Sequence, residues 1–369
     1  MKVQILTPNL QNKLSFLNRA ISSKPQIPVL QNFLLEAHEN KIKLSSTDLE
    51  IGIEINCPAQ VEEAGEITVP AKLFTELINS LSDDTLTLET KENTLEVQTK
   101  KTQSRFQTIN SEEFPKLYEE KGEKLAVLSG KDIKPELSSV VFAASQDTTR
   151  PALSGILVRK EANGFLLVAT DGYRLSLRHY KVTDSHVGEA NSFIIPARVF
   201  RELLAMKEEG EDINMYISQQ NNQVLFEQGE TVLIGRLIEA EFPNFEKIIP
   251  SDFSVSTACD REELLKAVKI CSVFARDSAN IIKLSLAKDH IMVSSGASSV
   301  GENSVRVDAN LSGEENEIAF NSRYLLDVLS NVEEKNLVFD MIGPLNPGVF
   351  KIQNDESFLH LIMPIRVQG

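Results

Sequence analysis

The side chains best suited to chemistry are few in this chain and form no recognisable catalytic or metal-binding pattern. The sequence contains five histidines and no tryptophan, and its three cysteines (Cys57, Cys259 and Cys271) are too scattered for a metal knuckle or a disulfide framework. The motifs GxxxxGK[ST], GxGxxG, HExxH and GxSxG are absent. We therefore expect no catalytic site, no bound metal and no cofactor.

Two aspartates recur at matching positions and need a separate explanation. Asp48 lies in Ser46-Thr-Asp, and Asp171 lies 123 residues later in Ala169-Thr-Asp-Gly. Two adjacent carboxylates can act as general acid and general base. Each aspartate belongs to its own repeat, however, and the third copy at residues 293–307 loses it. A shared two-carboxylate site is therefore not expected, and we predict that the protein is not an enzyme.

Length and composition indicate a soluble protein of more than one domain. Its 369 residues are about two to three times a typical domain length. Apolar residues make up 41% and charged residues 25% of the chain. No run approaches the roughly 18 apolar residues of a membrane span, and the N-terminus has no signal-peptide pattern. We expect a cytoplasmic protein with reduced thiols and no membrane partner.

The net charge limits the possible partners. Lysine and arginine number 38 against 53 aspartates and glutamates, which gives a formal charge of −15. The chain as a whole should repel nucleic acid and anionic membranes. A contact with DNA would need a local surface whose charge differs from the average.

One pattern recurs three times along the chain. The segment ITVPAKLFTEL (67–77) returns as FIIPARVFREL (193–203) and, more loosely, as IAFNSRYLLDVL (318–329). The anchor residues of these segments are 126 and 125 residues apart: Pro70, Pro196 and Asn321. Each unit closes on a dipeptide that ends in proline, namely Phe114-Pro115, Phe242-Pro243 and Met363-Pro364. The repeat predicts three similar domains, over residues 1–123, 124–248 and 249–369.

Each unit shows the same succession of helix and strand patterns. It opens with apolar residues three and four apart: Leu10, Leu14, Leu17 and Ile21, then Leu137, Val140 and Val141, then Leu264, Leu265, Val268 and Cys271. Asp132 and Asp260 are placed to cap the second and third of these helices. Strand patterns follow, then a second helix (about 71–80, 197–207 and 321–332) and three more strands. We expect α+β domains with helices on one face of antiparallel sheets.

The predicted helices hold more positive charge than the rest of the chain. The segments 8–24, 71–80, 131–144, 197–209, 260–276 and 321–335 contain 15 basic and 12 acidic residues, a net charge of +3 that leaves −18 elsewhere. Mixed lysine and glutamate on solvated helix faces would explain so small an excess. Alternatively, the helices share one surface that contacts phosphates without reading bases, so that binding would be independent of sequence and sensitive to salt.

With these repeats in place, the sequence resembles the bacterial DNA polymerase III beta subunit, the sliding clamp, over its full length. The resemblance rests on the order, spacing and repetition of short motifs rather than on any one of them. They are MKVQI (1–5), IPVL (27–30), STDLE (46–50), VPA (69–71), QD (146–147), RPALSGI (150–156), ATDGYRL (169–175), EFP (241–243), IAFN (318–321) and IMPIR (362–366).

The resemblance implies three tandem domains of the clamp fold and a head-to-tail homodimer. Its six similar domains would close a ring, with the helices lining the hole and the antiparallel sheets outside. Twelve helices at about 8–10 Å spacing make a circle roughly 30–40 Å across. Subtracting about 10 Å of helix thickness leaves a hole on the order of 20–30 Å, wide enough for duplex DNA.

The resemblance also implies the function and the partners. Such a ring encircles duplex DNA without reading its sequence, and it tethers the catalytic subunit of DNA polymerase III and other replication and repair proteins. A separate clamp loader opens the ring, because this chain is not expected to hydrolyse ATP. The expected location is the cytoplasm, at the nucleoid.

A partner-binding pocket between the second and third domains is a further implication of the resemblance. An apolar groove would accept the hydrophobic end of a short extended peptide, and three cations would attract its polar or acidic groups. Taken alone, the same segments predict only a strand–turn and a core-filling last strand, and Gln368 and Gly369 would lie near the pocket mouth. The lining residues are Leu153, Thr170, Gly172, Tyr173, Arg174, Leu175, Pro243, Lys247, Ile248, Val349, Met363, Pro364, Ile365, Arg366 and Val367.

For contact with DNA, the resemblance points to Lys24, Lys72, Arg198 and the loop that holds Gln146 and Arg150. Family members often carry aromatic residues in that loop, where this chain has Pro151-Ala152. For the interface between protomers, it points to Phe106 in the first domain and to Val273 and Phe274 in the third. Without the resemblance, Phe106 would be an ordinary core aromatic.

Other classes of protein fit less well. A repetitive scaffold that does not encircle DNA is the main alternative, because threefold repeats without converging polar residues suit either role. A carbohydrate-binding array is disfavoured by the absence of tryptophan and of a signal-peptide pattern. The related clamps of eukaryotes and archaea have two domains per chain and form trimers, so three repeats favour the bacterial dimer.

Overall fold

In the computed structural model of the chain, the structure describes all residues except 23, 183, 186–191, 207–210, 298–300 and 367–369. The described part divides into two compact units. The first unit contains residues 1–131 and 198–237 with the short strand Asp184–Ser185. The second unit contains residues 132–182, 192–197 and 238–366.

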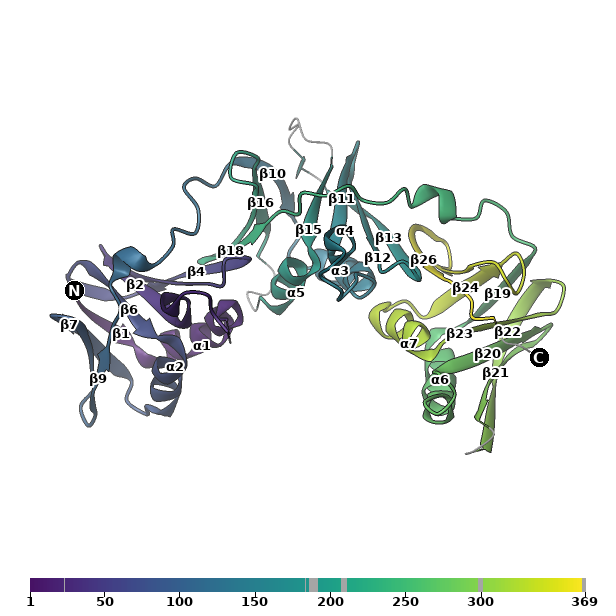
Figure 1. Cartoon of the computed structure of the whole chain (residues 1–369), viewed down its shortest axis with the longest axis horizontal. Coiled ribbons are helices and arrows are strands. Elements are labelled where there is room, and N and C mark those ends of the chain that lie inside the picture. Colours follow the sequence, from purple (N-terminus) through teal and green to yellow (C-terminus); the bar gives the residue numbers. More distant parts are fainter. Residues whose placement is uncertain (23, 183, 186–191, 207–210, 298–300, 367–369) are drawn as a thin grey trace. The chain divides into compact units, whose positions relative to one another are not determined.

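The first repeat alternates helices with antiparallel strands (Figure 1). Its elements are β1 (Lys2–Leu6), α1 (Thr7–Leu17), β2 (Asn32–His38), β3 (Lys41–Thr47), β4 (Ile51–Pro58), β5 (Gln60–Glu63), β6 (Gly65–Pro70), α2 (Ala71–Ser80), β7 (Thr85–Lys91), β8 (Thr94–Gln98) and β9 (Gln103–Gln107). Helix α2 has the predicted bounds, and its apolar spacing buries Phe74 and Ile78. Helix α1 ends at Leu17, earlier than the pattern predicts, and a 3₁₀ turn follows over Asn18–Ala20.

The second and third repeats follow the same order, and three strands come after the second long helix of each, as predicted. The second repeat contains β10 (Glu123–Leu128), α3 (Ile133–Val141), α4 (Pro151–Ser154), β11 (Gly155–Glu161), β12 (Gly164–Thr170), β13 (Arg174–Lys181), β14 (Asp184–Ser185), β15 (Ser192–Pro196), α5 (Ala197–Ala205), β16 (Ile213–Ser218), β17 (Gln223–Gln228) and β18 (Thr231–Arg236). The third contains β19 (Val255–Asp260), α6 (Arg261–Ala275), β20 (Ile281–Ala287), β21 (His290–Ala297), β22 (Gly301–Gly313), β23 (Asn316–Asn321), α7 (Ser322–Asn331), β24 (Asn336–Met341), β25 (Gly348–Ile352) and β26 (Asp355–Ile362).

Each repeat opens with a strand, whereas the hydrophobic pattern predicted a helix at the start. These strands are only five or six residues long. Each one pairs with a strand far along the chain: β1 with β7, β10 with β16, and β19 with β24. Because the stabilising partner is distant in sequence, the local periodicity gave no signal for them.

The predicted apolar faces of the helices form core. Leu10, Leu14 and Leu17 are buried on α1, as are the predicted positions Leu137, Val140 and Val141 on α3 and Leu264, Val268 and Cys271 on α6. The Asp260 side chain caps α6, accepting hydrogen bonds from the backbone N–H groups of Glu262 (2.8 Å) and Glu263 (3.1 Å). Asp132 does not cap α3, because its own backbone is already helical (φ −87°, ψ −31°).

The antiparallel sheets continue from one repeat into the next. In the first unit, β4 pairs with β18 of the second repeat, with Ile51 opposite Gly235. In the second unit, β13 pairs with β26 of the third repeat, with Arg174 opposite Ile362. The sheet orders are β5-β1-β7-β8-β9, β14-β10-β16-β17-β18-β4-β3-β2-β6 and β15-β11-β12-β13-β26-β25-β24-β19-β22-β21-β20-β23. The two compact units therefore do not coincide with the three repeats.

Candidate functional site

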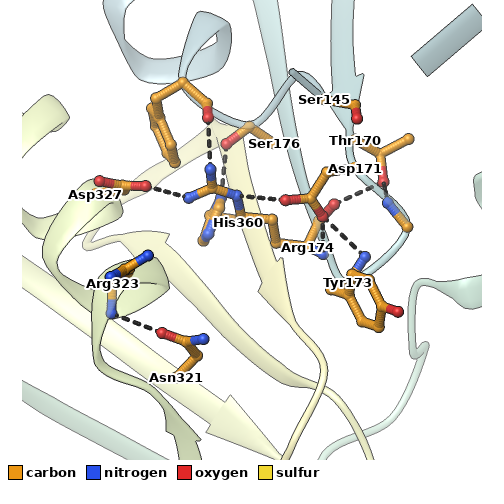
Figure 2. Close-up of polar contacts among 12 residues, drawn as sticks. Ser145, Thr170, Asp171, Tyr173, Arg174, Ser176, Asn321, Arg323, Asp327 and His360 are labelled. Atoms are coloured by element: carbon orange, nitrogen blue, oxygen red, sulfur yellow. Dashed lines mark hydrogen bonds and ion pairs between the residues drawn. The ribbon is translucent and has the colours of Figure 1, made fainter. Parts of the chain in front are cut away.

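The loop between β12 and β13 is built by its own polar side chains (Figure 2). The Thr170 hydroxyl donates to the carbonyl of Arg174 (2.6 Å) and accepts from the N–H of Gly172 (3.1 Å). Asp171 Oδ1 accepts from the N–H groups of Tyr173 (2.9 Å) and Arg174 (3.1 Å). Gly172 has φ +93°, a conformation that glycine adopts without strain. Asp171 thus holds a turn, and the turn presents Tyr173 outward.

The equivalent loop between β3 and β4 repeats these bonds. Thr47 Oγ1 donates to the carbonyl of Ile51 (2.7 Å) and accepts from the N–H of Leu49 (3.0 Å). Asp48 Oδ1 accepts from the N–H groups of Glu50 (3.1 Å) and Ile51 (3.0 Å). The recurrence of the two aspartates is therefore explained by turn geometry, since each carboxylate is engaged by its own backbone.

Arg174 is the most heavily bonded side chain near the predicted pocket (Figure 2). It is only 8% exposed, and its guanidinium pairs with Asp171 (3.1 Å) and Asp327 (2.5 Å) and donates to the carbonyl of Phe142 (2.8 Å). It also stacks over the ring of Tyr324, 4.6 Å from the centroid. Its positive charge is thus balanced within the protein, and it joins the second repeat to α7 of the third.

A buried histidine lies beside Arg174. His360 has no exposed surface, and its Nδ1 lies 2.6 Å from the Ser176 hydroxyl. Its Nε2 has no hydrogen-bond partner among the described residues. Burial, followed by the positive charge of Arg174, lowers the pKa of His360 well below its usual value. The imidazole is therefore neutral in the folded protein at physiological pH.

The segments predicted to line the pocket come together in the second unit. The β13–β26 pairing places Met363 beside Tyr173, whose carbonyl accepts from the Met363 N–H (2.8 Å). Leu175 and Val349 share one apolar cluster with Phe245, which lies in the segment that connects the second and third repeats. We call the predicted lining residues the peptide surface. They derive from five separate stretches of sequence.

The peptide surface exposes apolar side chains. Tyr173, Ile248 and Met363 are 60%, 46% and 40% exposed, and Pro243 is exposed as well. The other apolar members are partly or fully buried and support these side chains from below: Leu153, Leu175, Val349, Pro364 and Ile365. The predicted Val367 and the neighbouring Gln368 and Gly369 lie outside the described residues.

Two predicted cations of the peptide surface are exposed, in contrast to Arg174. Lys247 follows Phe245 in a short 3₁₀ turn (Glu246–Ile248), and Arg366 follows the last strand. Within the described part of the chain, neither side chain forms an ion pair. The N–H of Ile365 donates to the carbonyl of Ala319 (2.8 Å), so the segment that carries Arg366 is attached to β23.

The predicted DNA-contacting residues differ in how far their charge is available. Lys24 and Lys72 are exposed and have no ion-pair partner among the described residues. Arg198 is half-buried and pairs with Asp48 (2.6 Å) and Glu50 (3.1 Å). In the predicted loop, Gln146 is exposed, while Arg150 pairs with Asp147 (3.2 Å).

The predicted interface residues lie on an edge strand and on a helix. Phe106 is half-buried on β9, the last strand of its sheet, and packs edge-to-face on Phe74 (5.9 Å). Val273 on α6 is 58% exposed, and Phe274 is partly buried. Ile270, three residues before Val273 on the same helix, is 48% exposed and was not predicted. Its i, i+3 spacing to Val273 was the available signal.

The candidate nucleophiles and metal ligands are not arranged for chemistry. The three cysteines are free and buried. Burial raises the pKa of the Cys57 thiol to about 11 and that of the Cys259 thiol to about 12, so both stay protonated. Among the described residues, no three His, Cys, Asp or Glu side chains gather closely enough to hold a metal ion. The described helices include none with the length and apolar character needed to cross a membrane.

Sequence and structure comparisons match the whole chain to one family. The N-terminal, central and C-terminal domain models of the DNA polymerase III beta subunit match residues 1–118, 127–244 and 246–366. The beta sliding clamp of Synechococcus elongatus is 31% identical over 379 residues, with full coverage of both chains. That of Staphylococcus aureus is 30% identical over 360 residues, 94% of each chain.

A solved structure agrees with these matches. The DNA polymerase sliding clamp of Bacillus subtilis superposes with a TM-score of 0.94 at 26% identity, and the superposition covers all of both chains. Three tandem domains of the clamp fold therefore make up the chain. With the family models and the full-length relatives in agreement, the chain belongs to the family of bacterial DNA polymerase III beta subunits, the beta sliding clamps.

Proposed function

We propose that two copies of the chain assemble head to tail into a closed ring that encircles duplex DNA and tethers the replicative polymerase. The observation that carries this proposal is the threefold repeat of one α+β domain along the whole chain. Two copies supply six such domains, with boundaries that we place at residues 123/124 and 248/249. In a closed head-to-tail ring, the first domain of each protomer contacts the third domain of its partner, so both contacts are of the same type.

The first and third repeats offer complementary features for the contact between protomers. Helix α6 exposes the apolar pair Ile270 and Val273, and apolar surface on a helix is commonly covered by a partner. In the first repeat, β9 is an edge strand that carries Phe106. These features support a heterologous contact between the first repeat of one protomer and the third repeat of its partner.

The charge distribution suits a ring that slides. Lys24 and Lys72 provide isolated positive charges, while the sequence as a whole carries −15. Weak contacts with phosphates bind any DNA sequence and dissociate easily, and the closed ring prevents escape. The DNA partner would therefore be duplex DNA of any sequence. A clamp loader would be needed to open the ring, and we place the protein in the cytoplasm, at the nucleoid.

The peptide surface is the proposed docking site for the polymerase catalytic subunit and for other replication and repair proteins. Exposed Tyr173, Ile248 and Met363 would receive the apolar residues of a short extended peptide. Exposed Lys247 and Arg366 would attract its acidic or polar groups. The double variant Met363→Ala/Arg366→Ala should weaken peptide binding and leave the dimer intact, whereas loss of the dimer would mean that these residues are structural.

The decisive experiment measures topological retention. After loading in moderate salt, the protein is incubated on nicked circular plasmid and on the same plasmid linearised. Retention on the circle together with loss from the linear ends is the result expected of a ring. Equal retention on both would indicate ordinary charge-driven binding, and no retention with an active loader would favour a scaffold that does not encircle DNA.

A further inference from the structure

The first unit contains a hollow of about 390 Å³ beside the loop between β3 and β4. We propose that it is a second peptide-binding site, which receives a short extended segment of a partner protein carrying an apolar side chain and a carboxylate. The proposal rests on the proposed function, because it extends peptide docking to a second place on the chain. The residues that carry it are Leu49, Lys116, Leu117, Gln223, Ile234 and Arg236.

The backbone around the hollow repeats that of the peptide surface. A threonine hydroxyl closes the turn in both loops. The hydroxyl of Thr47 donates to the carbonyl of Ile51 (2.7 Å), and that of Thr170 donates to the carbonyl of Arg174 (2.6 Å). The end of the neighbouring strand, β18 beside β4 and β26 beside β13, is attached to the loop in the same way. The N–H of Arg236 donates to the carbonyl of Glu50 (3.1 Å), as that of Met363 does to Tyr173 (2.8 Å). Arg236 therefore occupies the position that Met363 occupies in the peptide surface.

The inner wall of the hollow is apolar. Ile234 is 3% exposed on β18, and Leu117 lies against β4, where a Cβ on Gly52 would come within 3.3 Å of its Cδ2 atom. At the rim, Leu49 is 47% exposed. An apolar side chain that entered between Leu49 and Leu117 would exchange water contacts for apolar ones.

A buried hydrogen-bond acceptor lies in the same wall. Gln223 donates from Nε2 to the carbonyl of Leu117 (2.9 Å), whereas its Oε1 is buried without a hydrogen-bond partner among the described residues. Buried acceptors without a partner cost free energy, and most are satisfied by protein or by bound molecules. Because this oxygen has no exposed surface, a donor in the hollow would bond to it only after the Gln223 side chain moved.

The charges at the rim favour a carboxylate. Lys116 and Arg236 are both exposed, and neither forms an ion pair within the part of the chain that the structure describes. Of the two glutamates that also line the hollow, Glu50 is paired with Arg198 (3.1 Å), and only Glu119 opposes the two cations. Because Arg236 lies where the peptide surface has Met363, peptide binding at the hollow should be more sensitive to salt than binding at the peptide surface.

The test maps where a peptide crosslinks to the full-length protein. The probe is a synthetic hexapeptide, acetylated and amidated, that alternates leucine and aspartate and ends in photoreactive benzoylphenylalanine. After irradiation the protein is digested, and adducts are located by mass spectrometry. We expect adducts within residues 115–119 or 221–236, and about tenfold fewer of them in Lys116→Glu/Arg236→Glu. Both substituted side chains are exposed, so the fold should persist.

A matched variant controls for the change in charge. Lys41 and Lys131 are exposed lysines of the same unit that do not line the hollow. Lys41→Glu/Lys131→Glu changes the net charge equally and should leave the adducts at the hollow unchanged. Adducts there that survive Lys116→Glu/Arg236→Glu, or that disappear equally in the control, would overturn the proposal.

The same digest separates this proposal from the proposed function. Adducts at Tyr173 or residues 363–366 report on the peptide surface, and Met363→Ala/Arg366→Ala should remove those alone. Adducts only at the peptide surface would refute the second site and leave the first standing. Adducts only at the hollow would refute the peptide surface and leave the second site standing. A peptide that crosslinks at neither place would refute both sites.

Discussion

Arg174 contributes chiefly to the stability of the fold, although it lies in a stretch that resembles a binding motif. Its guanidinium joins Asp171 in its own loop to Asp327 on α7 and to the carbonyl of Phe142. Removal of this buried cation would be destabilising, because it would leave Asp171, Asp327 and the Phe142 carbonyl without their partner.

We predict that Arg174→Met lowers the free energy of unfolding of the second unit by about 2–3 kcal/mol. The value is below that of a fully buried ion pair because Asp327 is 42% exposed and partly screened by water. Urea denaturation followed by circular dichroism measures it. The control Arg323→Met alters an exposed arginine on α7, the helix that holds Asp327. It should change the free energy of unfolding by less than about 0.5 kcal/mol. Equal effects of the two variants would contradict a structural role for Arg174.

His360 makes the stability of the second unit dependent on pH. In the folded state, burial and then the positive charge of Arg174 lower the pKa of His360, whereas in the unfolded chain its pKa is about 6.5. Above that value the imidazole is neutral in both states. Below it the unfolded chain binds a proton that the folded protein does not, so stability falls as the pH decreases.

We therefore predict that lowering the pH from about 7.5 to about 5.5 reduces the midpoint of thermal unfolding. His360→Asn cannot titrate and should show a smaller decrease over the same interval. His38→Asn, at an exposed histidine of the first unit, serves as control and should behave like the wild type. A His360→Asn variant with an undiminished decrease would show that other groups cause it.

At the scale of elements, α6 has two apolar faces with different roles. Leu264, Val268 and Cys271 are buried in the core of the third repeat. Ile270 and Val273 are exposed on the other face. A helix that is apolar on its outer face is suited to a contact with another molecule, and here that contact is the proposed interface between protomers.

We predict that Val273→Asp yields folded monomers, because the side chain is exposed in the isolated chain and a carboxylate would be buried in the dimer. Sedimentation velocity measures the change in mass. Leu345→Asp is a matched control, since Leu345 is 64% exposed in the same unit and outside the predicted interface. Phe106→Asp should also give monomers, but it removes a ring contact with Phe74 and tests the interface less cleanly. A dimer that survives Val273→Asp would refute the assigned interface.

At the scale of the whole molecule, the chain is a member of the beta sliding clamp family, whose members are processivity factors rather than enzymes. The acidic overall charge agrees with a protein that does not grip DNA tightly, and the predicted DNA-contacting cations differ in how far their charge is available. In this respect Lys24 and Lys72 differ from Arg198, whose charge is already balanced by Asp48 and Glu50.

We predict that Lys24→Ala/Lys72→Ala flattens the dependence of log affinity for linear duplex on log salt by up to about 1.8, since each lost phosphate contact contributes about 0.9. Arg198→Ala should change this slope less. Fluorescence anisotropy with a labelled duplex at several salt concentrations provides the measurement. Retention on a nicked circle should be unaffected in moderate salt. A larger effect of Arg198→Ala would mean that its ion pairs open in favour of phosphate.

Much of the architecture could be predicted from the sequence alone, because the signals are local. The bounds of α2 and the buried faces of α1, α3 and α6 follow from residue spacing within a few turns of chain. The threefold repeat is visible because similar segments recur, with anchor residues 126 and 125 residues apart. The stretches that form the peptide surface were identified by resemblance, because taken alone they predict only a strand–turn and a core-filling last strand.

How segments far apart in the chain combine could not be predicted from the sequence. The opening strands β1, β10 and β19 depend on partners far along the chain, and the pairings β4–β18 and β13–β26 carry each sheet across a repeat boundary. The bonding of Arg174 to Asp327, 153 residues away, and the hollow around Gln223 arise from those pairings. Contacts at such separations leave no periodic trace in the sequence, because they depend on which surfaces are brought together when the sheets form.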